Sequence, residues 1–254
     1  MRYVLSAALE QAPIWSALWS KMEGLPICRA HGALHSFLPG FAFAALLSVC
    51  DGGPRPPVSM DAEMGQRIRA YSVGIGYQAG QELRATGMLT PYAGIILTND
   101  HAIPGAKSTK ITLDGKEFHE ARVIARNAEL DLALLKVENG EFSAELPELA
   151  TSPRAGMPVV AFGSAFGLHR SFLQGYVSHE RRVGLRGQTK GTHYIQVQSI
   201  TFPGMSGAPV FTLQGEWIGI NRAAYGYTTT TGTGLLIPAS RVHQWMEETL
   251  PEKQ

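Results

Sequence analysis

Short β-prone runs separated by turn residues fill the chain from residue 66 onward, and this pattern constrains the fold more than any other feature. The runs are rich in Val, Ile, Leu, Phe and Tyr, and Gly, Pro, Asn, Asp or Ser bound most of them. Such spacing is typical of all-β sandwiches and barrels. Twelve runs are expected to be strands: 68–77, 87–90, 94–99, 110–114, 121–125, 132–137, 158–163, 172–178, 194–200, 208–212, 216–221 and 234–238.

Helical periodicity is clear only near the C-terminus. Val242, Trp245, Met246 and Leu250 fall at i, i+3, i+4 and i+8, and Pro251 follows as a stop. No linker-like stretch interrupts residues 66–250. We therefore expect residues 66–254 to form one two-barrel, all-β module that ends in a single helix.

Charge and cysteine content exclude several functions. The formal net charge is only +1, so nothing in the electrostatics points to a nucleic-acid partner. The two cysteines, Cys28 and Cys50, precede the main domain, which rules out a zinc ribbon, a cysteine nucleophile and a disulfide framework within it. The eight histidines are scattered without metal-ligand spacing, so we expect no metal. The sequence has no Walker loop, and the glycine-rich residues 74–80 lack the spacing of a dinucleotide-binding loop, so we expect no cofactor.

The N-terminal segment 1–50 has the features of an export signal. Residues 37–49 carry no charge, and Lys21 and Arg29 precede them. The run is shorter than the ~20 apolar residues that a membrane-spanning helix needs, so an export segment is favoured over a transmembrane helix. Counted from Met22 instead of Met1, the segment has the usual length of a signal peptide, which makes Met22 an alternative start.

Residues 47–50 resemble the lipobox of bacterial lipoproteins, although Val49 replaces the usual small residue. The resemblance implies lipid attachment at Cys50 and a location in the periplasm or cell envelope, with anchoring to a membrane. The Gly/Pro-rich residues 51–65 would then form an extended tether. A cleaved soluble signal, an uncleaved anchor and a buried core segment remain open alternatives.

A serine flanked by glycines is the first candidate for chemistry. Ser206 lies in the segment 203–209, between two expected strands. A tight turn there would expose the Ser206 hydroxyl and direct the N–H groups of Gly204 and Ser206 to one point, as in an oxyanion hole. Taken alone, such a segment is more often a plain hairpin, so the catalytic interpretation needs a base and a carboxylate.

Two titratable residues can supply them. His101 ends the apolar run 95–101, and Asp131 stands within the apolar run 130–135, where a buried carboxylate must be paired. Asp100 is the sequence neighbour of His101 and would point to the opposite face of a strand. Asp131 is therefore the better candidate to orient His101, with an ordinary strand-edge aspartate as the alternative.

The sequence resembles the trypsin-like serine peptidases, specifically their HtrA/Deg branch. Residues 94–103 (GIILTNDHAI), 129–137 (ELDLALLKV) and 203–221 (PGMSGAPVFTLQGEWIGIN) resemble that family's histidine, aspartate and serine motifs. The resemblance implies two six-stranded antiparallel β-barrels. His101 and Asp131 would come from the first barrel, and Ser206 with the Gly204 and Ser206 oxyanion hole from the second.

The implied function is hydrolysis of peptide bonds by a Ser-His-Asp triad, in protein quality control or processing in the cell envelope. The expected partners are protein or peptide substrates, including unfolded ones. A noncatalytic peptide-binding pseudo-peptidase and a structural envelope scaffold are the alternatives, and oligomerisation stays open.

The resemblance also places a specificity pocket. Its base would be the residue six before the serine, Ile200, and its wall would include Ala223 and Ala224, with Arg222 narrowing the entrance. An apolar base cannot neutralise a buried cation, so we expect a small or medium apolar residue before the cleaved bond.

Three features depart from the family pattern. Met205 replaces an Asn or Asp, and Ala208 replaces a Gly, which predicts a slightly different oxyanion turn. Without a carboxylate at Met205, activation by pairing with a new N-terminal amine is not expected. The sequence ends at Gln254, so we expect no PDZ domain after the peptidase module.

Overall fold

The computed structural model describes residues 59–76, 83–185, 192–225 and 233–250. The predicted export segment 1–50, including Cys50, and most of the predicted tether lie outside these residues.

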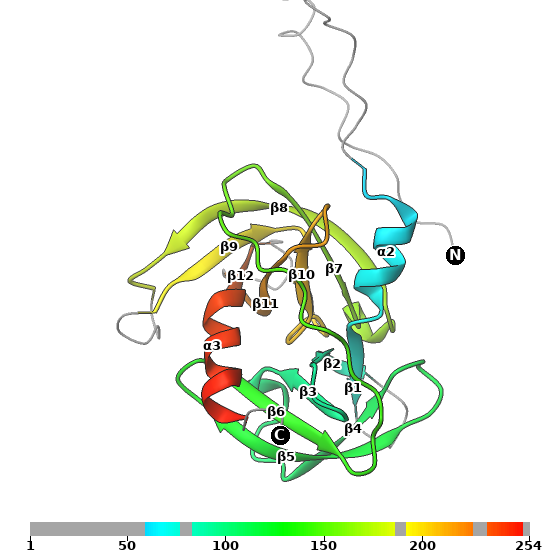
Figure 1. Ribbon diagram of the computed structural model, residues 1–254. Coiled ribbons are helices and arrows are strands. Elements are labelled where there is room, and N and C mark those ends of the chain that lie inside the picture. Colours follow the sequence, from blue (N-terminus) through cyan, green and yellow to red (C-terminus); the bar gives the residue numbers. More distant parts are fainter. Residues whose placement is uncertain (1–58, 77–82, 186–191, 226–232, 251–254) are drawn as a thin grey trace, which may run out of the picture. The chain divides into compact units, whose positions relative to one another are not determined.

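The first six strands close into one antiparallel barrel. Around the barrel the strands follow the order β1-β2-β3-β6-β5-β4 (Figure 1). They are β1 (Ser72–Gly76), β2 (Leu83–Leu89), β3 (Ile95–Thr98), β4 (Ser108–Thr112), β5 (His119–Asn127) and β6 (Leu132–Val137). The interior is filled by side chains such as Val73, Ile96, Ile111 and Leu135, none of which is more than 2% exposed.

The next six strands close into a second antiparallel barrel in the order β10-β11-β12-β9-β8-β7. They are β7 (Pro158–Gly163), β8 (Ser171–Arg182), β9 (Tyr194–Gln198), β10 (Pro209–Thr212), β11 (Trp217–Ala224) and β12 (Thr233–Pro238). The two six-stranded barrels confirm the predicted all-β fold class, and each of the twelve expected runs contains or overlaps one strand.

The C-terminal helix α3 (Ala239–Thr249) follows β12 directly, as the periodicity predicts. Its buried residues are Ala239, Val242, Trp245 and Met246. These residues belong to a core cluster that also contains Leu132 and Leu134 of the first barrel and Trp217 of the second. The helix therefore packs where the two barrels meet (Figure 1).

A second α-helix, α2 (Ala62–Arg69), is absent from the sequence-based expectation, which made residues 68–77 one strand. The side chain of Asp61 caps its N-terminus by accepting a hydrogen bond from the Glu63 N–H. Only Ile68 on this helix is buried. One buried residue gives no periodic apolar pattern, which is why the helix escapes a reading based on periodicity.

Candidate active site

His101 lies in a short 3-10 helix, η1 (Asp100–Ala102), directly after β3. Its backbone N–H donates to Asp131 Oδ1 at 3.0 Å, and its ring Nδ1 lies 2.8 Å from Asp131 Oδ2. Asp100 instead forms an ion pair with Arg126. The strand geometry from which we expected Asp100 to face away is wrong, because Asp100 and His101 lie in a 3-10 helix after β3. The two contacts to Asp131 fix both the backbone and the ring of His101.

Asp131 is the last residue before β6 and adopts a left-handed backbone conformation, with φ of 60°. Its side chain is 7% exposed, so its charge must be compensated by neighbouring groups. Besides His101, it has Arg222 of β11 as a partner, with 3.0 Å between Arg222 Nε and Asp131 Oδ2. The Asn99 side chain donates to the Asp131 carbonyl at 2.9 Å and ties the turn to the end of β3.

Arg222 is held from two sides. Its guanidinium carbon lies 5.2 Å from the centre of the buried Tyr194 ring, in a cation–π arrangement. Arg222 Nε makes no hydrogen bond of good geometry with the described residues. Its contact with Asp131 is therefore an ion pair without an aligned hydrogen bond. The sequence singled out Arg222 only as a residue that narrows a pocket entrance, and nothing in the pattern indicated its pairing with Asp131.

Ser206 lies in the loop that precedes β10 and reaches His101 from the second barrel. Its Oγ lies 2.9 Å from His101 Nε2 and 3.3 Å from the carbonyl oxygen of Arg222. The three residues that the sequence proposed as a triad therefore lie in one continuous chain of polar contacts: Asp131, His101 and Ser206.

The loop around Ser206 needs glycine at two positions. Gly204 and Gly207 have φ values of 89° and 84°, which strongly favour glycine. A Cβ at Gly204 would lie 2.0 Å from the Ser164 carbonyl oxygen, and one at Gly207 would lie 2.0 Å from the Thr86 carbonyl oxygen. The loop can therefore approach Ser164 and Thr86 this closely only because residues 204 and 207 are glycines.

Two backbone carbonyls of this loop bear on the position of its N–H groups. The Pro203 carbonyl accepts from the Phe166 N–H at 2.7 Å, and the Met205 carbonyl accepts from the Ala208 N–H at 3.0 Å. Within the described residues, the N–H groups of Gly204 and Ser206 donate to no backbone carbonyl. Since each of these N–H groups shares a peptide plane with one of those carbonyls, both are left available to an incoming oxygen atom.

The predicted pocket residues are placed as follows. Ile200 is fully buried in the core of the second barrel, and its carbonyl accepts from the Asn221 side chain at 2.7 Å. Ala223 and Ala224 lie at the end of β11, just beyond Arg222, and are partly exposed. An apolar pocket base at Ile200 remains a prediction.

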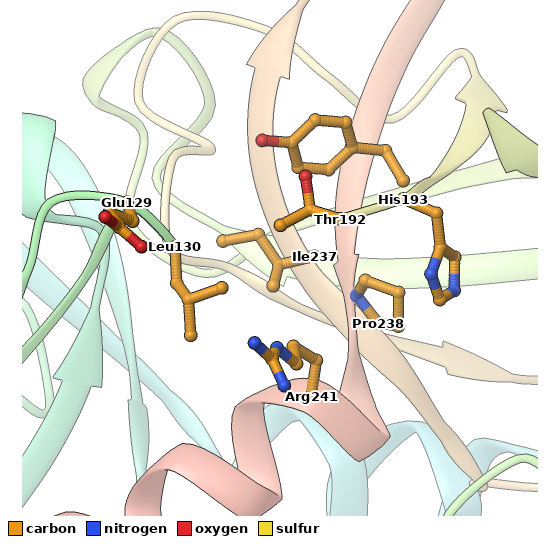
Figure 2. Close-up of a pocket in the computed structure, with 8 residues that line it drawn as sticks. Glu129, Leu130, Thr192, His193, Ile237, Pro238 and Arg241 are labelled. Atoms are coloured by element: carbon orange, nitrogen blue, oxygen red, sulfur yellow. The ribbon is translucent and has the colours of Figure 1, made fainter. Parts of the chain in front are cut away.

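A separate cavity of about 200 Å³ is lined partly by sequence neighbours and contacts of the site residues. Figure 2 shows the side chains that line it. Its lining includes Leu130, the residue before Asp131, and Tyr194, whose ring packs against Arg222. The other lining residues are Glu129, Thr192, His193, Ile237, Pro238 and Arg241. Burial, together with the charges of Arg181 and Arg241, lowers the pKa of His193. The triad residues do not line this cavity.

The described part of the chain contains no group of three or more His, Cys, Asp or Glu side chains that could hold a metal ion. Neither of its described α-helices is long and apolar enough to cross a membrane.

The sequence was compared with known families and curated proteins. The profile of the trypsin-like peptidase domain matches residues 85–220. Serine protease HTRA4 of Mus musculus is 34% identical over 169 residues, which cover 64% of this chain and 34% of the mouse protein. Serine protease HTR4 of Bos taurus is 35% identical over 170 residues, which cover 65% of this chain and 34% of the bovine protein. The chain thus spans about a third of the length of these curated relatives.

Solved structures with the same fold point in the same direction. The HtrA-type protease AlgW with tripeptide has a TM-score of 0.65 and 24% identity, and the match covers 74% of this chain and 62% of that one. The MamO protease domain from Magnetospirillum magneticum has a TM-score of 0.62 and 22% identity, and the match covers 71% of this chain and 98% of that domain. At these identities the structures support the fold, and the sequence comparisons support the family. The chain belongs to the family of trypsin-like peptidase domains, and it is similar to HtrA-type serine proteases.

Proposed function

We propose that this protein hydrolyses peptide bonds with Ser206 as nucleophile, His101 as general base and Asp131 as the orienting carboxylate. The observation that carries the proposal is the chain of contacts from Asp131 Oδ2 to His101 Nδ1, at 2.8 Å, and from His101 Nε2 to Ser206 Oγ, at 2.9 Å. Both distances suit direct hydrogen bonds, which proton transfer between these groups requires.

In the first half of the reaction, Ser206 Oγ attacks the substrate carbonyl carbon while its proton moves to His101 Nε2. Asp131 holds the Nδ1–H tautomer of His101 and stabilises the imidazolium that forms. His101 then gives the proton to the leaving amine, and an acyl-enzyme remains on Ser206. In the second half, water attacks this ester with His101 again as base, and the carboxylic acid product leaves.

The negative oxygen of each tetrahedral intermediate needs donors that are already in place. We assign this role to the N–H groups of Gly204 and Ser206. Their peptide planes are anchored through the carbonyls of Pro203 and Met205, as described above. Preorganised donors of this kind usually supply the largest electrostatic contribution to acyl transfer. The arrangement favours a working peptidase over a noncatalytic peptide-binding relative, because the Pro203 carbonyl is tied away from the oxyanion position.

Peptides are the proposed substrates. The related AlgW structures contain a tripeptide and a decapeptide, respectively. For this chain we propose small or medium apolar residues before the cleaved bond, because the side chain of Ile200 would leave a substrate cation unpaired. Cleavage sites in a denatured protein mixture would test this. Predominant Ala, Val or Leu before the bond is expected, whereas predominant Lys, Arg, Asp or Glu would contradict it.

We further propose that the protein acts in the cell envelope, in quality control or processing, and that Cys50 carries a lipid. The support is the lipobox-like segment 47–50 and the apolar run before it. The Cys50→Ser variant should leave the membrane fraction or remain unprocessed. An unmodified Cys50 in protein isolated from cells, established by intact mass spectrometry, would overturn the lipid assignment without affecting the peptidase proposal.

A fluorophosphonate probe tests the activated serine directly. We expect rapid labelling of the wild-type protein at Ser206, located by peptide mapping, and no labelling of Ser206→Ala. Ser171→Ala is a matched control, because the Ser171 hydroxyl donates to the Leu168 carbonyl and contacts no imidazole within the described residues. Labelling at another residue, or none in the folded wild-type protein, would refute the proposed mechanism and favour the pseudo-peptidase alternative.

A further inference from the structure

Thr86, on β2 of the first barrel, lies against the loop of the second barrel that contains Ser206. It is fully buried. Its own carbonyl accepts a hydrogen bond from the Thr98 hydroxyl at 2.8 Å, which joins it to β3 of the same barrel. Thr86 is therefore a rigid part of the first barrel.

Three further hydrogen bonds connect Thr86 to the second barrel. The Thr86 N–H donates to the Ser206 carbonyl at 2.8 Å, and the Thr86 hydroxyl donates to the Gly204 carbonyl at 2.8 Å. The same hydroxyl accepts from the Ser164 N–H at 2.9 Å. The Thr86 hydroxyl thus forms hydrogen bonds both with the serine loop, at Gly204, and with the segment that contains Ser164 and Phe166.

These bonds complete the anchoring of the loop. Phe166 and Ala208 hold the carbonyls of Pro203 and Met205, and Thr86 holds those of Gly204 and Ser206. Four consecutive peptide planes therefore have fixed orientations, and Thr86 bonds two of the four. Each of these two planes is also held on its N–H side, by a hydrogen bond from Met205 to the Phe202 carbonyl at 3.0 Å and from Gly207 to the Asn221 carbonyl at 2.8 Å. The two proposed oxyanion donors lie within this stretch, so an error in any plane displaces them.

The departure at Met205 explains why such anchoring is needed. A carboxylate at this position could hold the loop by an ion pair, but Met205 is apolar and fully buried. Its Sδ lies so close to Gly163 that a Cβ there would be 2.6 Å away. Packing keeps Met205 in the core, but it does not specify the direction of any backbone N–H. Directional hydrogen bonds must do that.

We propose that Thr86 is a positioning residue for the oxyanion hole. Its hydroxyl couples the rigid first barrel to the orientation of the Gly204 and Ser206 N–H groups. This inference rests on the serine peptidase mechanism proposed above. Thr86 does not touch substrate. It acts by fixing the Gly204 carbonyl and the Ser164 N–H, so its removal should impair the transition state more than substrate binding.

The test compares Thr86→Val, which keeps the shape but removes the hydroxyl, with Thr86→Ser, which keeps the hydroxyl. We expect Thr86→Val to lower kcat by about 10- to 100-fold, somewhat less than loss of a whole oxyanion donor, with KM changed by less than about threefold. The rate of fluorophosphonate labelling should fall by a similar factor. Thr86→Ser should recover kcat to within about fivefold of wild type.

Thr90→Val is the matched control. Thr90 is equally buried in the first barrel, and its hydroxyl donates to the Ile95 carbonyl at 2.9 Å, within the same barrel. Both Val variants should lower Tm to a similar extent, but Thr90→Val should leave kcat and KM unchanged. If Thr86→Val does not fold, Thr86→Cys replaces it, because a thiol is a weak hydrogen-bond donor and acceptor.

The outcomes separate the two proposals. An inactive, unlabelled wild-type protein would refute the peptidase mechanism itself. An active wild type with an unchanged kcat in Thr86→Val, or with a loss of kcat in Thr86→Ser equal to that in Thr86→Val, would overturn only the role of the Thr86 hydroxyl. A kcat loss shared by Thr90→Val would assign the effect to general stability of the barrel, and so would also overturn it.

Discussion

Arg222 Nε lies 3.0 Å from Asp131 Oδ2, so the nearly buried Asp131 carboxylate has a permanent cation beside it as well as His101. The ion pair joins β11 of the second barrel to the turn before β6 of the first. A carboxylate in such a place is costly unless it is paired. Arg222 therefore provides a countercharge whether or not His101 is protonated.

Removing this cation should destabilise the fold. Arg222→Met is expected to lower the free energy of unfolding by about 1–2 kcal/mol, less than for a fully buried pair because the Arg222 side chain is 28% exposed. In an Asp131→Asn background the same change should cost much less, and denaturant titration of the four proteins yields the coupling. Arg122→Met is the control, since its pair with Glu138 is more than 60% exposed on both sides and should contribute about 0–1 kcal/mol. Equal losses in both backgrounds would contradict the pairing.

A methyl group at Gly207 should abolish activity. Gly207→Ala places a Cβ 2.0 Å from the Thr86 carbonyl oxygen on a backbone with φ of 84°, so the loop must move away from the first barrel. We expect a loss of stability above about 2 kcal/mol and a kcat at least about 100-fold lower. Gly105→Ala isolates the backbone contribution, because φ is 63° there and nothing lies within 4 Å of the added Cβ. It should cost only about 1 kcal/mol and leave kcat unchanged. Similar kinetics for the two variants would contradict the tight approach.

His169 should make stability depend on pH. Burial lowers the pKa of His169 from its ordinary value, and the charges of Arg170 and Arg69 lower it further. The unfolded chain therefore binds more protons than the folded protein in the range between the lowered pKa and about 6.5. The stabilisation is complete above this range, and the free energy of unfolding decreases as pH falls through it. Denaturant titrations from pH 7.5 down to pH 5 should show a smaller decrease for His169→Gln than for wild type. Parallel curves would show that His169 is not responsible.

The fold could be predicted because its signals are local: alternating short apolar runs indicate strands. The positions of His101, Asp131 and Ser206 next to such runs made them candidates, but it was the resemblance of their motifs to a known family that joined them into a proposed triad. The helix α2 was not predicted because it buries only one residue, Ile68, and so shows no helical apolar period. Its Asp61 cap is a short-range signal that the apolar pattern does not reveal.

Thr86 and the partner of Arg222 could not be predicted for a different reason. The hydrogen bond from Thr86 to Gly204 joins residues 118 positions apart, across the junction of two barrels. No periodicity or turn signal specifies such a contact, because it depends on how the barrels dock. A threonine in a strand is equally compatible with a plain cross-strand contact.

In the proposed mechanism, Ser206 carries out the chemistry after activation by His101 and Asp131. The most direct measurement is kcat/KM on casein or a peptide library for Ser206→Ala, His101→Ala, Asp131→Asn and the double variant Ser206→Ala with His101→Ala. Each single substitution should lower kcat/KM by about 10⁴-fold or more without unfolding the domain, and the double variant should be little worse, because the residues act as a unit. Near-normal turnover by folded Ser206→Ala would contradict the account.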